Sequence, residues 1–141
     1  MKKNLIVAVV YGIFLLTLLT SCSRKLTFLN SAVVPAAEGV VKINKDGNSN
    51  YAIQVKVTHL AEPSRLQPER EMYVVWMVTE KNGTKNIGQL KSSSGFFSSV
   101  LEGELNTVSS FKPERVFITA ENNANIQYPG SIVILTTKGP N

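Results

Sequence analysis

The stretch YAIQVKV, residues 51–57, decides the fold class of this chain of 141 residues. Its larger apolar side chains stand at every second position, with Ala52, Gln54 and Lys56 between them. Side chains of a β-strand point alternately to the two faces of its sheet, so this pattern predicts a strand with one buried face and one solvated face. No part of the chain beyond residue 22 carries apolar residues at helical spacing over three turns. We therefore expect an all-β fold.

Turn signals and further apolar segments surround this strand. Asp46-Gly47 and Asn82-Gly83 are dipeptides typical of β-hairpin turns. The run MYVVWMVT at 72–79 is almost continuously apolar, which is typical of a central strand covered on both faces. Two prolines and several charges make residues 61–71 an expected loop. Other expected strands lie at 39–44, 84–91, 96–105, 115–121 and 131–137.

About seven short strands with turns at this spacing predict a single small immunoglobulin-like β-sandwich. The length of the chain leaves room for one domain with a modest core. Trp76, the only tryptophan, is expected to anchor that core between the two sheets.

The first 21 residues are organised as a signal peptide, expected to be helical. Lys2 and Lys3 form a positive n-region, and residues 5–19 are an uncharged apolar run of 15 residues. Such a run is long for a signal h-region and short for a membrane span of about 20 residues. The alternative is an uncleaved anchor helix that ends at Cys22.

The four residues Leu19, Thr20, Ser21 and Cys22 resemble the lipobox of bacterial lipoproteins. In that family the signal peptidase recognises the three residues before the cysteine, whose thiol receives a diacylglyceryl group and whose new amino group is usually acylated. A thiolate is the nucleophile that such a thioether requires. Cys22 is the only cysteine, so it has no disulfide partner within the chain. We expect its acyl chains to hold the protein on a membrane surface without spanning the membrane.

The residues after Cys22 bear on which membrane is used. Lipoproteins of enteric bacteria stay in the inner membrane when Asp follows the cysteine, and here Ser23 follows, which favours the outer membrane. Residues 23–25 lack the acidic cluster of a surface-export signal, which favours the periplasmic face. The expected organisation is a signal peptide at 1–21, a lipidated tether at 22–37 with a candidate first edge strand at 26–29, and a β-sandwich domain at 38–138.

Several motifs follow one another between Met72 and Leu135. They are Tyr73-x-x-Trp76, Asn82-Gly83, Ile87-Gly88, the segment FITAE at 117–121, and Pro129-Gly130. Their order resembles the extracytoplasmic C-terminal domain of anti-sigma-K factor-like proteins, in which a YxxWxx strand, a DG or NG turn and a terminal VTxEP segment recur on a β-sandwich.

This resemblance covers roughly half of the chain and has two departures. Asn122 stands where a proline usually follows the glutamate, and the Asn-rich residues 122–125 replace a Gly-rich loop. The resemblance implies a sandwich that serves as a tethered sensing, binding or envelope domain, with no catalytic residues to carry over. In that family a cytoplasmic N-terminal region holds the sigma factor, and we expect no such region here.

The residue inventory argues against catalysis. His59 is the only histidine and Asp46 the only aspartate, so a Ser-His-Asp triad or a Cys/His metal cluster has no spare members. His59 is expected at the surface. Glu102 and Glu104 point to the same side of an expected strand, where a solvated face is favoured over a glycosidase-like pair of carboxyl groups.

Asp46, with Asn48 and Asn50, has the opening spacing of a calcium loop, but the downstream acidic ligand is missing. We therefore expect no catalytic residues, no metal, no cofactor and no enzymatic activity.

The charge balance excludes a nucleic-acid partner. The formal net charge is +5, and removal of the leader with Lys2 and Lys3 leaves 13 basic and 10 acidic residues. These are scattered singly along the sequence, without the basic stripe of a nucleic-acid binder.

Two segments are candidate binding surfaces. Phe96 and Phe97 stand side by side in a Ser/Gly-rich stretch, where neighbours on a strand would face opposite sides. The polar loop at 122–130 contains Asn123, Ile126 and Tyr128, an amphipathic mixture typical of recognition loops. The structural alternatives are a buried bend and a long turn.

Two functions remain. The first is a non-enzymatic envelope lipoprotein whose sandwich binds a protein or another envelope partner. The second is a small-ligand or glycan-binding sensor, which a concave apolar pocket beside these loops would favour.

Overall fold

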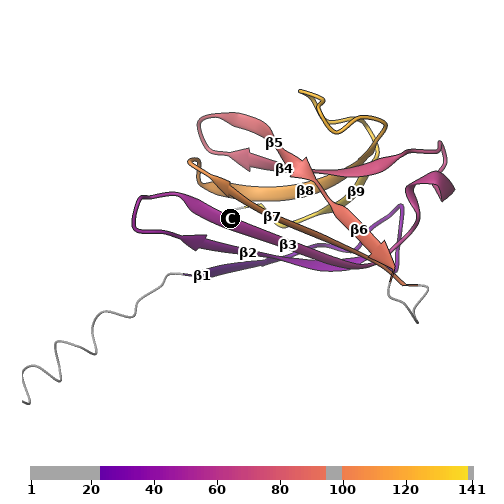
Figure 1. The fold of residues 1–141 in the computed structure, drawn as a ribbon, viewed down its shortest axis with the longest axis horizontal. Helices are drawn as coiled ribbons and strands as arrows, with labels where there is room; N and C mark the ends of the chain where they lie inside the picture. The colour runs from indigo at the N-terminus through magenta and orange to yellow at the C-terminus, as the bar shows by residue number, and fades with distance from the viewer. Residues whose placement is uncertain (1–22, 95–99, 140–141) are drawn as a thin grey trace, which may run out of the picture.

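The structure is a computed structural model that describes residues 23–94 and 100–139. Within these residues the chain is all-β, with two antiparallel sheets that face each other (Figure 1). The first sheet has the strand order β1-β2-β3-β7-β6 and the second has the order β5-β4-β8-β9. The strands are β1 (Ser23–Thr27), β2 (Glu38–Lys45), β3 (Tyr51–Leu60), β4 (Met72–Thr79), β5 (Gly83–Gln89), β6 (Lys91–Ser94), β7 (Leu101–Ser109), β8 (Pro113–Glu121) and β9 (Val133–Thr136), with a short 3-10 turn at Pro63–Arg65.

The strand order confirms the expected immunoglobulin-like sandwich. Strands β2, β3, β7 and β6 occupy the positions A, B, E and D of that fold, and β4, β8 and β9 occupy C, F and G. Two further strands extend this set of seven: β1 pairs with the outer side of β2, and β5 pairs with β4. The expected signal helix lies outside the described residues.

The main core lies between the sheets and follows from the period of two in the sequence. Ile53, Val55 and Val57 of β3 point into it, and Tyr73 and Val75 of β4 meet them from the second sheet. All five are at most 1% exposed. Burial of each such side chain is worth roughly 1.5–3 kcal/mol relative to leaving it in water, so this layer is the main stabilising element of the fold.

The expectation that Trp76 anchors the core between the sheets is wrong. Its side chain is fully buried, but it lies on the outer face of the second sheet with Val74 and Phe117. Because Tyr73 and Val75 face inward, the alternation of β4 forces Trp76 outward. An almost continuous apolar run gives no contrast between the two faces, so the sequence could not tell which one is the core.

Both expected hairpins are present. Lys45 pairs with Tyr51 across the turn of residues 46–50, and Thr79 pairs with Gly83 across residues 80–82. Gly83 has the positive φ of 67° that a three-residue hairpin needs at the end of its loop. In the first turn the left-handed residue is Ser49, with a φ of 64°, whereas Gly47 has an ordinary conformation.

The segment at 22–37, expected as a tether, belongs to the sandwich from Ser23 onward. Strand β1 pairs with β2 over its whole length, slightly earlier than the expected edge strand at 26–29. Phe28 is buried in the core, and the backbone N–H of Leu29 donates to the carbonyl of Thr136 at 2.9 Å. The chain thereby passes from one sheet to the other and closes that side of the sandwich. The apolar residues of this segment are too few and too irregular to show this by periodicity alone.

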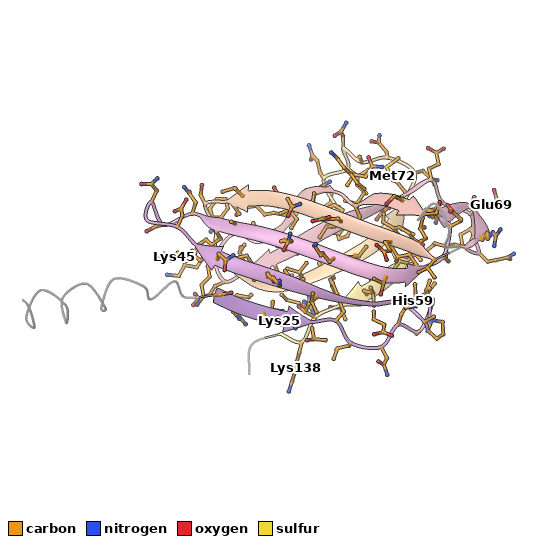
Figure 2. The ribbon with its side chains drawn as sticks, turned by 60° about the horizontal axis from the view of Figure 1, so that its bottom comes forward. Lys25, Lys45, His59, Glu69, Met72 and Lys138 are labelled. Atoms are coloured by element: carbon orange, nitrogen blue, oxygen red, sulfur yellow. The ribbon has the colours of Figure 1, made fainter. Side chains whose placement is uncertain are left out.

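The sandwich has two distinct ends, which we call the turn end and the loop end. The turn end carries the first residue of β1 and the turns at 46–50, 80–82 and 110–112; the Arg24 side chain reaches the carbonyl of Pro113 there, at 3.4 Å. The loop end carries the β3–β4 loop at 61–71 and the β8–β9 loop at 122–132, joined by a hydrogen bond from Glu71 N–H to the Glu121 carbonyl at 3.0 Å. Lys25 and Lys45 lie toward the first end and His59 and Glu69 at the second (Figure 2).

Among the residues described, no helix has the length and apolar character needed to cross a membrane.

Candidate functional site

The β8–β9 loop folds back over the outer face of the second sheet, and one side chain on β5 holds it there. The Asn86 amide donates to the carbonyl of Ala124 at 2.8 Å and to that of Ile126 at 3.0 Å. Its own oxygen accepts the N–H of Gly88 at 3.0 Å, which fixes the orientation of the amide. Two partly buried hydrogen bonds therefore tie the loop to a strand that is not its neighbour in the sheet, and the third holds the Asn86 amide in place.

A buried carboxyl group closes the other end of this loop. Glu121, at the end of β8, is only 8% exposed, and its Oε1 accepts the N–H of Gly130 at 2.7 Å. A Cβ at position 130 would lie 2.7 Å from Glu121 Oε2, so a larger residue there would have to displace this carboxyl group. The loop is thus bound at both ends.

An apolar cluster supports the loop from below. The Trp76 and Phe117 rings stack with centroids 6.3 Å apart, and Ile126 packs against them from the loop. The Trp76 Nε1–H donates to Thr119 Oγ1 at 2.8 Å, so the indole is buried without an unpaired donor. The guanidinium of Arg115 covers the Phe117 ring at 5.8 Å.

The candidate residues of this loop have three different roles. Ile126 faces the sheet and is partly buried. The Asn123 side chain shapes the loop, since its Oδ1 accepts the N–H of Asn125 at 2.8 Å. Tyr128 projects into solvent with 81% of its surface exposed. Of the three candidates, Tyr128 is therefore the one whose side chain is mostly in solvent.

The other candidates, Phe96 and Phe97, lie outside the described residues. The strand ends on either side of them are Ser94 and Leu101, which pair with each other. Leu101 also pairs with Leu60, the last residue of β3, so these strand ends are at the loop end.

Sequence reasoning missed the contribution of the β3–β4 loop. Glu62, Glu69, Glu71 and Asn122 help to line an open hollow of about 500 Å³ between this loop and the start of the β8–β9 loop. The sequence AEPSRLQPERE shows these acidic groups, but only the fold brings them beside the second loop. A hollow with this charged lining differs from the concave apolar pocket that would favour a small-ligand sensor.

The β3–β4 loop is fastened to the core by Tyr73. Its hydroxyl donates to the carbonyl of Ala61 at 2.7 Å. Burial, with a smaller effect of the nearby Glu62 charge, raises the pKa of Tyr73 to about 12. The phenol therefore stays protonated and keeps donating at neutral pH.

The residues considered for catalysis are apart from one another. His59 is exposed in the bulge between Val57 and Leu60, with its Nδ1 at 3.2 Å from Thr58 Oγ1. Within the described residues, no group of three or more His, Cys, Asp or Glu side chains could hold a metal ion.

Glu104, one of the two carboxylates considered as a glycosidase-like pair, has structural partners. Glu104 accepts hydrogen bonds from Asn106 and Gln54 and lies 3.7 Å from the Lys56 ammonium, and its pKa is lowered, first by the Asn106 bond. It is exposed on the outer face of the first sheet together with Glu102, as the solvated-face interpretation predicts.

Asp46 caps its own turn. Its Oδ1 accepts the backbone N–H groups of Asn48 and Asn50, both at 2.8 Å, and the Asn50 bond is the main cause of its lowered pKa. This is the arrangement of an Asx turn, in which the carboxylate serves the backbone.

No family model, curated protein or solved structure matches this chain. The resemblance to the anti-sigma-K domain therefore remains a sequence-based expectation.

Proposed function

We propose that this protein is a bacterial lipoprotein, anchored through Cys22 and exposed on the periplasmic face of the outer membrane. The leader at 1–21, the lipobox of Leu19, Thr20 and Ser21, and the single cysteine support the anchor. All four lipobox residues lie outside the described residues, so this part of the proposal depends on the sequence. A lipid with two or three acyl chains gives stable attachment where a single chain does not.

The sandwich acts as a non-enzymatic module that binds a protein of the cell envelope. The observation that carries this proposal is the exposed Tyr128 on a loop held by Asn86 and Glu121. A tyrosine offers a large contact area with few rotatable bonds, and a loop already fixed in place loses little entropy when a partner binds. The resemblance of residues 72–135 to the anti-sigma-K domain also supports a binding function without catalysis.

The surroundings of Tyr128 define the chemistry of the partner. Three acidic residues, Glu62, Glu69 and Glu71, and one basic residue, Arg70, line the hollow at the same end of the molecule, so its formal charge is negative. A fitting partner presents an apolar pocket to the tyrosine and basic groups to these carboxylates.

The anchor is tested by replacing Cys22 with serine in the full chain. We expect the variant to stay unprocessed and to lack the acyl mass that the natural protein carries, as measured by mass spectrometry of the purified protein. A natural chain that keeps its leader and carries no lipid would contradict the anchor.

The binding surface is tested by placing a photo-crosslinking amino acid at position 128 in cells. The matched control position is Val108 on β7, which is 66% exposed and lies away from the β8–β9 loop. We expect a discrete protein adduct from position 128 and none from position 108. Identical adduct patterns at the two positions, or none at either, would count against this surface.

A further inference from the structure

The charged residues are divided unequally along the sandwich. From Ser23 onward there are 13 basic and 10 acidic residues. Residues in strands are assigned by their register to the half nearer the turn end or the half nearer the loop end, and residues in turns and loops are assigned by the strand ends that they join. The boundary between the two halves crosses β3 between Val55 and Lys56, and it crosses β4 at Trp76.

The half near the turn end is strongly basic. Four of its basic side chains come from β1 and β2, and five come from the turns and strands of the second sheet and the residues around it. Only three acidic side chains accompany these nine. The basic residues are Arg24, Lys25, Lys42 and Lys45 on the first sheet and Lys81, Lys85, Lys112, Arg115 and Lys138 around the second; the acidic ones are Asp46, Glu80 and Glu114.

The half near the loop end has the opposite balance, with seven acidic and four basic side chains. The acidic residues are Glu38, Glu62, Glu69, Glu71, Glu102, Glu104 and Glu121; the basic ones are Lys56, Arg65, Arg70 and Lys91. The formal charge therefore changes sign from one half of the molecule to the other.

Two lysines of the turn-end half are direct neighbours across strands. Lys25 on β1 pairs with Lys42 on β2, and both side chains are exposed on the outer face of the first sheet. Like charges at opposed positions destabilise a sheet unless a counter-charge is supplied. By contrast, Lys56 in the other half forms an ion pair with Glu104.

The proposed anchor lies next to this basic half in the sequence. Cys22 immediately precedes Ser23, the first residue of β1. Lys25 lies three positions after the lipidated residue, at most about 11 Å of extended chain. The field of an anionic membrane reaches about one Debye length, roughly 8–10 Å at physiological ionic strength. A lipid on Cys22 would bring the basic end of the sandwich within that field.

We infer that the turn end is a docking surface for anionic phospholipid headgroups, which orients the sandwich with its loop end away from the membrane. This inference rests on the proposed lipid anchor. It also explains why the chain is structured directly after Cys22. Because no flexible tether separates the lipid from the sandwich, the lipid and the basic surface can bind the same membrane simultaneously. Tyr128 and the acidic hollow are then presented to partners in the periplasm.

The test uses the full processed protein in vesicles, with single cysteines carrying an environment-sensitive fluorophore. Since Cys22 is the only natural cysteine and its thiol is blocked by lipid, Asn48→Cys at the turn end and Gln127→Cys at the loop end each provide one reactive thiol. Vesicles of phosphatidylcholine alone are compared with vesicles containing phosphatidylglycerol, both with a quencher attached to the headgroups. We expect at least fivefold stronger quenching at Asn48 than at Gln127, only in the anionic vesicles and only at low salt.

A matched pair of double variants isolates the charge effect. Lys25→Glu with Lys42→Glu reverses two charges at the turn end, and Arg65→Glu with Lys91→Glu makes the same change in net charge in the other half. Each basic residue near an anionic surface contributes roughly a fivefold factor in affinity. We expect the first pair to abolish the excess quenching at Asn48 and the second pair to leave it within twofold, with Trp76 fluorescence confirming that both remain folded.

The outcomes separate this inference from the proposed anchor. Mass spectrometry that finds no lipid on Cys22 overturns the anchor and the orientation together. A lipidated protein whose Asn48 probe is quenched equally in neutral and anionic vesicles, or not at all, overturns the orientation alone. Equal loss of quenching in the two double variants, or crosslinking of Asn48 to a protein in place of headgroup contact, also overturns it.

Discussion

Gly47 and Gly83 show how much a single residue can decide in this fold. Both lie in hairpin turns, and a Cβ added at either would meet nothing within 4 Å. They differ in backbone conformation, since only Gly83 has a positive φ, of 67°. We expect Gly83→Ala to lower the free energy of unfolding by about 1 kcal/mol, because an L-residue is strained in this region.

The matched control is Gly47→Ala, which should leave stability unchanged or raise it by up to about 1 kcal/mol through a less flexible unfolded chain. Urea denaturation followed by the fluorescence of Trp76 gives both values. Equal effects of the two substitutions would show that the conformational difference between the turns is unimportant.

Residue chemistry predicted some of these features and not others. The Asn82-Gly83 pair correctly indicated a hairpin, because glycine readily adopts the positive φ that Gly83 has there. The role of Asn86 had no sequence signal, since an asparagine in a strand can as easily face solvent. Its hydrogen bonds to Ala124 and Ile126 depend on a loop 38 to 40 residues further along the chain.

Among the elements, the segment before β2 could be a loose tether or a structural part of the sandwich, and a substitution at Phe28 distinguishes the two. Phe28 is 7% exposed and bridges to Thr137 of the second sheet, while its neighbour Leu29 is 50% exposed. We expect Phe28→Ala to destabilise the protein by roughly 3–5 kcal/mol, the usual cost of removing a buried phenylalanine. Thermal unfolding of the purified protein measures this loss.

Leu29→Ala is the control for that experiment and should cost less than about 1 kcal/mol, because half of its side chain is already in water. If Phe28→Ala were as mild as Leu29→Ala, the segment would be a tether after all, and the orientation inferred for the lipidated protein would lose its basis.

The elements also show where periodicity stops being informative. The alternation in β3 identified its buried face correctly, with Ile53, Val55 and Val57 in the core. In β4 both faces are apolar, so Trp76 could be assigned to the wrong one. The β8–β9 loop, which covers the Trp76 ring, is polar in composition. Only its Ile126 side chain packs against the apolar cluster.

At the scale of the whole molecule, the buried phenol of Tyr73 makes stability depend on alkaline pH. Burial raises its pKa from an ordinary value of 10.0 to about 12. Between these values the unfolded chain releases the proton and the folded chain keeps it, so the free energy of unfolding falls as the pH rises. The contribution is complete below pH 10 and is lost toward pH 12, with a total of roughly 2–3 kcal/mol.

Tyr73→Phe removes this titration and should give a flatter stability profile between pH 9 and pH 12 in urea denaturation, apart from the lysine titrations that both proteins share. Parallel profiles for the two proteins would contradict the role assigned to the phenol.

The all-β class, both hairpins and the immunoglobulin-like sandwich follow from the amino-acid sequence, because these depend on local periodicity and turn chemistry. It also supplied the proposed lipidation at Cys22, which rests on a contiguous motif. Three features become visible only in the folded molecule: which face of β4 is the core, that the chain joins the sandwich from Ser23, and how basic and acidic residues separate toward opposite ends. Those features depend on contacts between segments that are far apart in the chain, and the local pattern of neighbouring residues does not specify such contacts.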